Sequence, residues 1–85
     1  MIYTKLDLII NTVREELQNA FSKFGAFHNA HEGYAVILEE LDELWENVKL
    51  NQKNPERNLF MKKEAVQVAA MALRFLYDCI PDDLL

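Results

Sequence analysis

Apolar residues recur three and four positions apart along three long stretches of the chain, which is the periodicity of an amphipathic α-helix. The first stretch predicts a helix over about residues 4–24, the second over about 31–50 and the third over about 56–78. Apolar and polar residues alternate with period two nowhere for long, so no strand is expected. The pattern therefore predicts an all-α fold built from three long helices.

Local signals mark the expected ends of these helices. Thr4 is a candidate N-cap for the first helix, and Gly25 stands just past its last periodic residue, where helices often end on glycine. Asn54 followed by Pro55 is expected to provide the N-cap and the first position of the third helix. Pro81 should close that helix and leave the last four residues as a frayed tail.

The chain carries more apolar surface than one small bundle needs. Its 85 residues are expected to form a single domain, residues 1–85, and a core of this size alone is marginal. Yet 51% of the residues are hydrophobic, and the third helix is apolar almost all round between Ala65 and Leu76. A helix of that kind is usually buried on several sides. We therefore expect a helical bundle that is completed by dimerisation.

The net charge narrows the range of partners, and the cysteine content indicates the cellular setting. A net charge of −5 argues against nucleic acid and anionic membrane surfaces as partners, and it suits a site that concentrates divalent cations. The single cysteine, Cys79, permits no internal disulfide, which favours a reducing, cytoplasmic setting. The N-terminus has no signal-peptide pattern, and no run reaches the roughly 18 uncharged residues that a membrane helix needs.

The second predicted helix contains the most informative stretch, an acidic run laced with apolar residues. Glu40 lies at the edge of the apolar arc and Glu43 follows one turn later, so both carboxylates can point to one place beside the core. Glu64 and Gln67 share a face of the third helix with the same spacing. Together they would gather hard oxygen donors that suit Mg²⁺ or Mn²⁺. The spacing fits equally well an exposed acidic helix that pairs with nearby cations, namely Lys62, Lys63 or Arg74.

Two histidines three apart, His28 and His31, stand in the connector between the first two helices. They match neither the His-Glu-x-x-His motif of zinc proteases nor the Glu-x-x-His pairs of di-iron bundles. We expect surface or capping histidines, with a substrate contact as the alternative. Glu32 is expected to be a first-turn acid favoured by the helix dipole, or else an outer carboxylate of the acidic site.

The run Glu39-Glu40-Leu41-Asp42-Glu43, followed by Glu64-Ala65-Val66-Gln67 and an alanine-rich helix, resembles the MazG-like all-α nucleoside triphosphate pyrophosphohydrolases. That superfamily carries the pattern E-E-x-x-E, a spacer, and E-x-x-D. The resemblance extends from about residue 32 to residue 78. The first half of the motif matches in full, but Gln67 stands where the family has aspartate. An amide offers one neutral oxygen and cannot act as a base, so metal affinity should be lower.

The resemblance implies a Mg²⁺-dependent enzyme that splits a nucleoside triphosphate into monophosphate and pyrophosphate, assembled as a homodimer or homotetramer. It implies Glu40, Glu43 and Glu64 as metal ligands, with Gln67 at the fourth ligand position. Glu39 or Glu43 would then orient or deprotonate the attacking water.

Substrate contacts are expected from three further residues: His31, Lys63 and Arg74. Arg74 could equally pair with Asp78, one turn further along the helix. Phe27, His31 or Tyr34 could stack a nucleotide base, although Tyr34 falls, like Trp45, in the arc expected to face the core or a dimer interface. The nucleotide itself is not identified by the sequence.

Two other classes of function fit the same helices. One is a catalytically weak or inactive helical dimer that binds a nucleotide or a protein partner, which the substitution at Gln67 favours. The other is a plain coiled-coil assembly module, which would show no response to metal. The intact glutamates at positions 40, 43 and 64 favour the enzyme.

Overall fold

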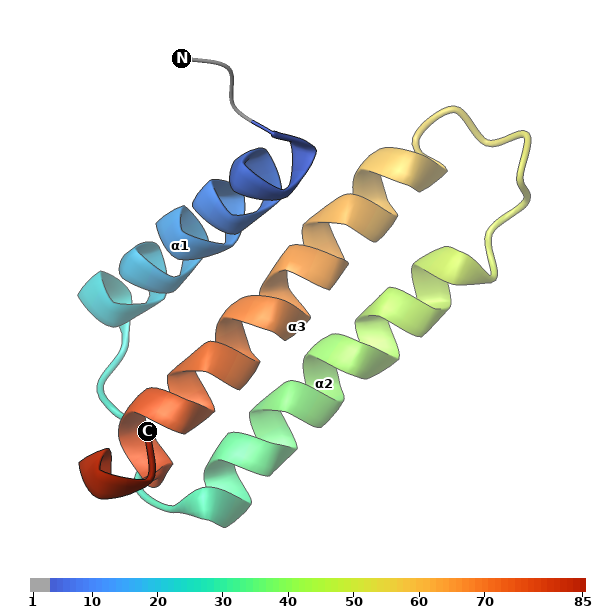
Figure 1. The fold of residues 1–85 in the computed structure, drawn as a ribbon. Helices are drawn as coiled ribbons and strands as arrows, with labels where there is room; N and C mark the ends of the chain where they lie inside the picture. Colours follow the sequence, from blue (N-terminus) through green and yellow to red (C-terminus); the bar gives the residue numbers. More distant parts are fainter. Residues whose placement is uncertain (1–3) are drawn as a thin grey trace.

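The computed structural model describes residues 4–85, and within them the chain is helical with no strand. Three long helices, α1 (Lys5–Lys23), α2 (Ala30–Val48) and α3 (Arg57–Cys79), are followed by a short 3₁₀ helix, η1 (Asp82–Leu84) (Figure 1). The all-α class is confirmed, and each long helix begins and ends within two residues of its predicted bounds. Completion of a bundle by a second chain stays a prediction.

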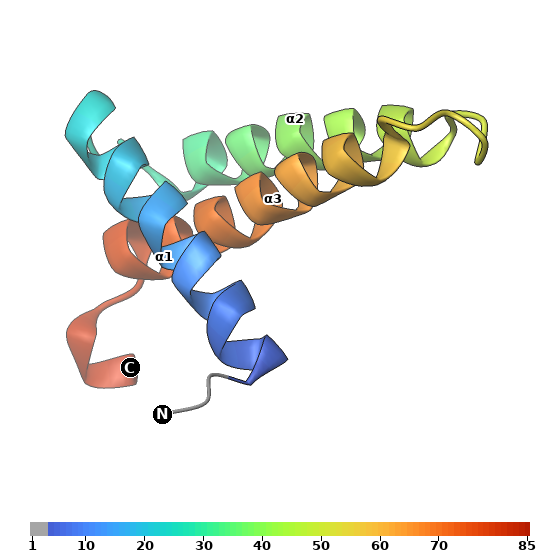
Figure 2. The ribbon, with the colours of Figure 1, turned by 90° about the horizontal axis from the view of Figure 1, so that it is seen from above.

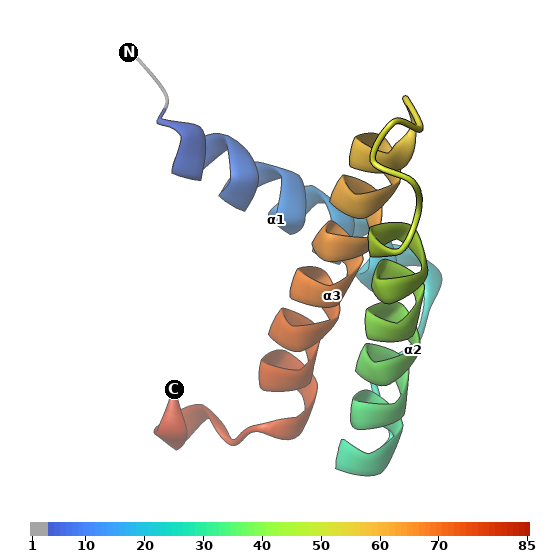
Figure 3. The same ribbon diagram turned by 90° about the vertical axis from the view of Figure 1, so that its right-hand side faces the viewer.

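The helix α3 is the centre of the arrangement. α2 runs back along it as an antiparallel hairpin, and α1 crosses it obliquely on another side (Figures 2 and 3). Both α1 and α2 pack against α3. One side of α3 is therefore left without a helix against it, and the three helices do not close into a bundle.

Side-chain caps fix the starts of α1 and α2. Thr4 and Asp7 form a capping box, in which each side chain accepts a hydrogen bond of 3.1 Å from the other residue's backbone N–H. The predicted N-cap at Thr4 is confirmed. Asn29 caps α2, because its side-chain oxygen accepts a 2.9 Å hydrogen bond from the N–H of Glu32. Both caps satisfy backbone donors that would otherwise lack a partner.

The end of α1 and the start of α3 differ from the predicted signals. α1 ends near Gly25 as expected, but Phe24 is the extended C-cap and no described glycine has a positive φ, so no left-handed glycine is used. The predicted N-cap at Asn54 is wrong: the side chain of Asn54 accepts from Glu56 N–H at 2.9 Å and so forms a turn. Helix α3 starts two residues later than that signal implied, with Glu56 as its N-cap.

The C-terminal tail is also more ordered than expected. Pro81 follows α3 directly, as predicted, but its carbonyl then accepts a 3.0 Å hydrogen bond from the N–H of Leu84. The segment therefore forms η1 instead of fraying.

Few side chains are fully buried. The core consists of Val13, Ala20, Phe27, Ala70 and Met71. Tyr34 and Trp45 of α2, which were expected to face the core or a dimer interface, lie with Leu38 and Leu41 on a stripe that is exposed in the single chain. The reason is geometric, because a helix packed against one neighbour buries only one narrow strip of its surface. No helix within residues 4–85 is long and apolar enough to cross a membrane.

A buried arginine ties the α1–α2 connector to α3. Arg74 is only 2% exposed, and its guanidinium donates hydrogen bonds to the carbonyls of Phe24 and Gly25. It also donates to the carboxylate of Asp78 at 3.3 Å, and that carboxylate accepts a 3.0 Å hydrogen bond from the N–H of Phe27. The predicted ion pair between Arg74 and Asp78 is confirmed.

A buried glycine, Gly33, lies where α2 packs tightly against α3. A Cβ at Gly33 would stand 2.7 Å from a ring carbon of Phe75 and 3.0 Å from a ring carbon of Phe27. Both distances are shorter than a normal carbon–carbon contact, so the side chains could not stay where they are. The glycine therefore lets the two helices meet closely about two turns before the acidic run of α2.

We predict that Gly33→Ala lowers the free energy of unfolding by about 1–2 kcal/mol, because overpacking outweighs the better helix propensity of alanine. Gly25→Ala is the matched control, since a Cβ at that position would have no atom within 4 Å and its φ is not positive. Urea denaturation at one protein concentration measures both. Equal stability of the two variants would contradict the close helix contact.

We also predict that Arg74→Met lowers the free energy of unfolding by about 3–5 kcal/mol, because it leaves the Asp78 carboxylate buried without its cation. Lys53→Met, in the exposed loop before α3, removes the same charge and should change stability by less than about 0.5 kcal/mol. Urea denaturation followed by circular dichroism compares the two. A loss below about 1 kcal/mol at Arg74 would refute its structural role.

Candidate metal centre

A pocket of about 310 Å³ opens where the end of α1 faces the middle of α2 and the first half of α3. Its lining comes from α1 and its C-cap (Glu16, Asn19, Ala20, Lys23 and Phe24), from α2 (Glu40 and Glu43) and from α3 (Lys63, Glu64 and Gln67). Acidic, basic and amide groups from three helices thus share one small volume. The sequence predicted the contributions of α2 and α3 but not that of α1.

Three carboxylates meet in this pocket. Each of Glu40, Glu43 and Glu64 offers an oxygen, and these oxygens all lie within 4.8 Å of one another. The i, i+3 spacing places the first two on one face of α2, and the antiparallel hairpin brings α3 alongside. The predicted convergence of the three glutamates is therefore found in the fold. Their role as metal ligands stays a prediction.

Gln67 lines the same pocket one turn after Glu64 and is half-buried. Its amide is thus available as the fourth oxygen donor that the sequence suggested. It brings no charge, so the negative charge of the site comes from the three glutamates alone.

Burial and mutual repulsion make the cluster costly without a cation. Burial first, and then the charges of Glu43 and Glu64, raise the pKa of Glu40 to about 7. Burial and the neighbouring Glu43 also raise the pKa of Glu64, while the charge of Lys63 acts in the opposite direction. The Oε2 atom of Glu64 is buried, and it has no hydrogen-bond partner among residues 4–85. A buried polar atom without a partner is rare in folded proteins.

Two lysines flank the carboxylates. Lys63 was predicted as a substrate contact and does line the pocket, next to Glu64 on α3. Lys23 was missed, because sequence periodicity assigns it to the solvated side of α1 and cannot show how that helix crosses α3. Phe24, beside it, is 66% exposed and also lines the pocket. The arrangement therefore offers positive charges and an aromatic surface beside the candidate metal ligands.

Three predicted site residues lie outside the lining of this pocket. Glu39 is exposed on α2, and His31 is exposed in the first turn of the same helix. Arg74 is buried, and its guanidinium is occupied by the connector and Asp78. A phosphate could reach Arg74 only if those contacts were broken.

The histidine connector is a capping structure in this fold. The Nδ1 atom of His28 lies 2.7 Å from a carboxylate oxygen of Glu32, and this pairing raises the pKa of the histidine and lowers that of the glutamate. Glu32 lies in the first turn of α2, as predicted for a dipole-favoured acid. It is not among the pocket residues.

No protein-family model, no curated protein and no solved structure matches this chain. The MazG-like resemblance therefore stays a prediction, based on the motif residues.

We predict that, without divalent cations, the melting temperature falls as the pH rises from about 5 to about 7.5. A carboxyl group whose pKa is higher in the folded state takes up a proton on folding, so stability is lost as the pH rises through the folded-state pKa of Glu40, about 7. Because the group faces a solvent-open pocket, we expect an effect of about 1 kcal/mol, or about 5 °C.

Glu40→Gln should remove most of this pH dependence. Asp42→Asn, which removes an exposed charge from the same helix, should keep the slope of the unchanged protein. Thermal melts followed by circular dichroism across the pH range measure both. Parallel pH profiles for the two variants would show that Glu40 is not the titrating group.

Proposed function

We propose that this protein is a Mg²⁺-dependent nucleotide pyrophosphohydrolase, which splits a nucleoside triphosphate into monophosphate and pyrophosphate. The observation that carries the proposal is the convergence of three glutamates on one pocket, with a buried carboxylate oxygen of Glu64 left unpartnered among the described residues. The motif resemblance supplies the reaction. Mn²⁺ is an alternative to Mg²⁺, because the donor set is made of hard oxygens in either case.

The residues present fit a hard divalent cation. Glu40, Glu43 and Glu64 would hold it, with the amide oxygen of Gln67 as a further donor. Burial and the two neighbouring carboxylates raise the pKa of Glu40 to about 7, and a divalent cation bound there would favour its ionised form. When bound, such an ion neutralises the triphosphate and lowers the pKa of a nearby water.

The protein side chains then have separate tasks in the reaction. Water attacks the α-phosphorus, a new phosphorus–oxygen bond forms, and the bond to the bridging oxygen breaks to release pyrophosphate. Glu43 is the better candidate for orienting this water and taking its proton, because it lines the pocket and Glu39 does not. Lys63 and Lys23 are placed to meet the negative charge of the departing pyrophosphate.

The other predicted substrate contacts receive less support. His31 is exposed outside the pocket, and Arg74 already serves the connector. We therefore assign the phosphate contacts to the two lysines. The base contact is assigned to Phe24, whose ring is exposed at the pocket. A cytoplasmic homo-oligomer without nucleic-acid or membrane partners remains part of the proposal, consistent with the free thiol of Cys79 and the net charge of −5.

A second candidate function follows from Gln67. An amide at the fourth ligand position makes the site less negative than an aspartate would. A less negative site suits a helical oligomer that binds a nucleotide or a protein partner with weak turnover or none. The two functions differ in a measurable way, because only the enzyme releases pyrophosphate.

We predict metal-dependent pyrophosphate release from at least one member of a panel of standard and modified nucleoside triphosphates, with Mg²⁺ or Mn²⁺, and none with EDTA. Glu43→Gln should lower the rate at least about 100-fold, because it removes both a metal ligand and the candidate base. Asp42→Asn, one residue away and exposed, should keep the rate of the unchanged protein.

The contrary outcomes are distinct. A folded protein that releases no pyrophosphate, but melts at a higher temperature with Mg²⁺, would support the binding function, and Gln67→Asp would then be expected to create turnover. No release and no thermal response to Mg²⁺ or Mn²⁺ would refute both functions. In that case Glu43→Gln should merely raise the melting temperature by relieving charge repulsion.

A further inference from the structure

The single chain exposes too much surface for a folded protein of its size. Its accessible surface is 6,722 Å². A monomer of 9.9 kDa is expected to expose about 5,200 Å². The excess, roughly 1,500 Å², lies in the range that one subunit buries in an obligate homodimer, about 1,000–2,500 Å². The excess accessible surface therefore indicates a partner that covers roughly 1,500 Å² of this chain.

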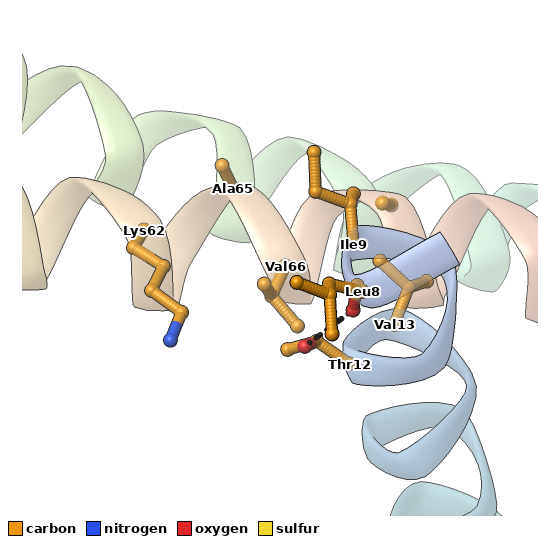
Figure 4. A pocket seen from close by; sticks show the side chains of 8 residues that line it. Leu8, Ile9, Thr12, Val13, Lys62, Ala65 and Val66 are labelled. Atoms are coloured by element: carbon orange, nitrogen blue, oxygen red, sulfur yellow. Dashed lines mark hydrogen bonds between the residues drawn. The ribbon is translucent and has the colours of Figure 1, made fainter. Parts of the chain in front are cut away.

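The exposed apolar surface includes a hollow between α1 and α3. Leu8, Ile9 and Val13 of α1 face Ala65 and Val66 of α3 around a pocket of about 370 Å³ (Figure 4). Leu8 and Ile9 are 58% and 49% exposed, although they line it. Lys62 stands at its polar end (Figure 4).

A second hollow continues this surface. It has a volume of about 580 Å³ and shares Ile9, Val13 and Ala69 with the first, so the two form one apolar face. Ala72 and Leu73 extend it along α3. Alanines at positions 65, 69 and 72 leave room for side chains of an approaching helix. We call this surface the α1–α3 face.

The α1–α3 face lies away from the acidic pocket. On α3, Ala65 and Ala69 point roughly opposite to Lys63 and Gln67, because successive helical residues turn by about 100°. Glu40 and Glu43 do not line either hollow. A partner seated here would leave the candidate metal centre open.

Charge decides between this face and the other exposed apolar stripe, on α2. That stripe, Tyr34, Leu38, Leu41 and Trp45, is set in a helix with six carboxylates. A symmetric contact between two such helices would bring like charges together. α1 carries three basic and three acidic residues, so two copies of it can meet without net repulsion.

We propose that the α1–α3 face binds a second copy of this chain, in a twofold contact where the exposed Leu8 and Ile9 of each copy enter the hollows of the other. A twofold contact uses the same patch on both copies, so it requires a ridge and a hollow on one surface. The α1–α3 face has both. This inference concerns assembly alone. Its test measures the mass of the assembly, which does not depend on the proposed activity.

The test is sedimentation equilibrium of the full chain over a wide concentration range. The unchanged protein should have twice the 9.9 kDa chain mass. Ile9→Glu should raise the dissociation constant at least about 100-fold, because it places a charge in the apolar contact. Leu84→Glu, also at an exposed apolar residue but in η1, should leave the mass unchanged.

Leu41→Glu, on the α2 stripe, should keep the α1–α3 dimer intact. An unchanged protein that stays monomeric would overturn the proposal, and so would a dimer that Leu41→Glu breaks and Ile9→Glu does not. If Ile9→Glu fails to fold, hydroxyl-radical footprinting of the unchanged dimer decides instead. Leu8 and Ile9 should then be protected relative to Leu84, and equal oxidation of all three would overturn the location.

Discussion

The buried pairing of Arg74 with the α1–α2 connector is the interaction on which the other helix positions depend. α1 packs on α3 and not alongside α2, so its direction is set by that packing and by the connector that follows it. Arg74 holds the carbonyls of Phe24 and Gly25, and Asp78 holds the N–H of Phe27. A buried cation that satisfies backbone carbonyls in this way is costly to remove, because both the charge and the carbonyls would lose their partners. The pocket residues Lys23 and Phe24 are the last residue of α1 and the first of this connector, so their place beside the glutamates follows from it.

The acidic pocket lowers the stability of the fold, whereas the Arg74 pairing raises it. Close contact at Gly33 brings α2 onto α3, and further along the same pair of helices three carboxylates offer oxygens within 4.8 Å of one another. Apolar packing therefore supplies the free energy that keeps like charges together. Such local conflict between stability and arrangement is typical of functional sites. The raised pKa of Glu40 is the electrostatic sign of that conflict.

Sequence periodicity predicted the helices and the side chains that meet when two helices lie side by side. It did not predict features that depend on how one helix crosses another or on how many neighbours a helix has. The three helices, the cap at Thr4 and the convergence of Glu40, Glu43 and Glu64 follow from spacing within helices that lie side by side. Lys23 was missed because its position depends on how α1 crosses α3. The exposure of the α2 stripe around Leu41 in the single chain was not predicted, because periodicity identifies an apolar arc but not how many neighbours cover it. Asn54 was misplaced because asparagine caps turns as readily as helices.

Gln67 connects the stability of the pocket with its chemistry. A fourth carboxylate at this position would add a charge to a cluster in which burial and repulsion already raise the pKa of both Glu40 and Glu64. The amide avoids that cost and keeps an oxygen at the pocket, so the cluster is less strained without a cation and its attraction for one is weaker. The lysines at positions 23 and 63 reduce the attraction further, unless a polyanion binds together with the cation. Under the proposed function, these charges would favour joint binding of a divalent cation and a phosphate-rich ligand over binding of either one alone.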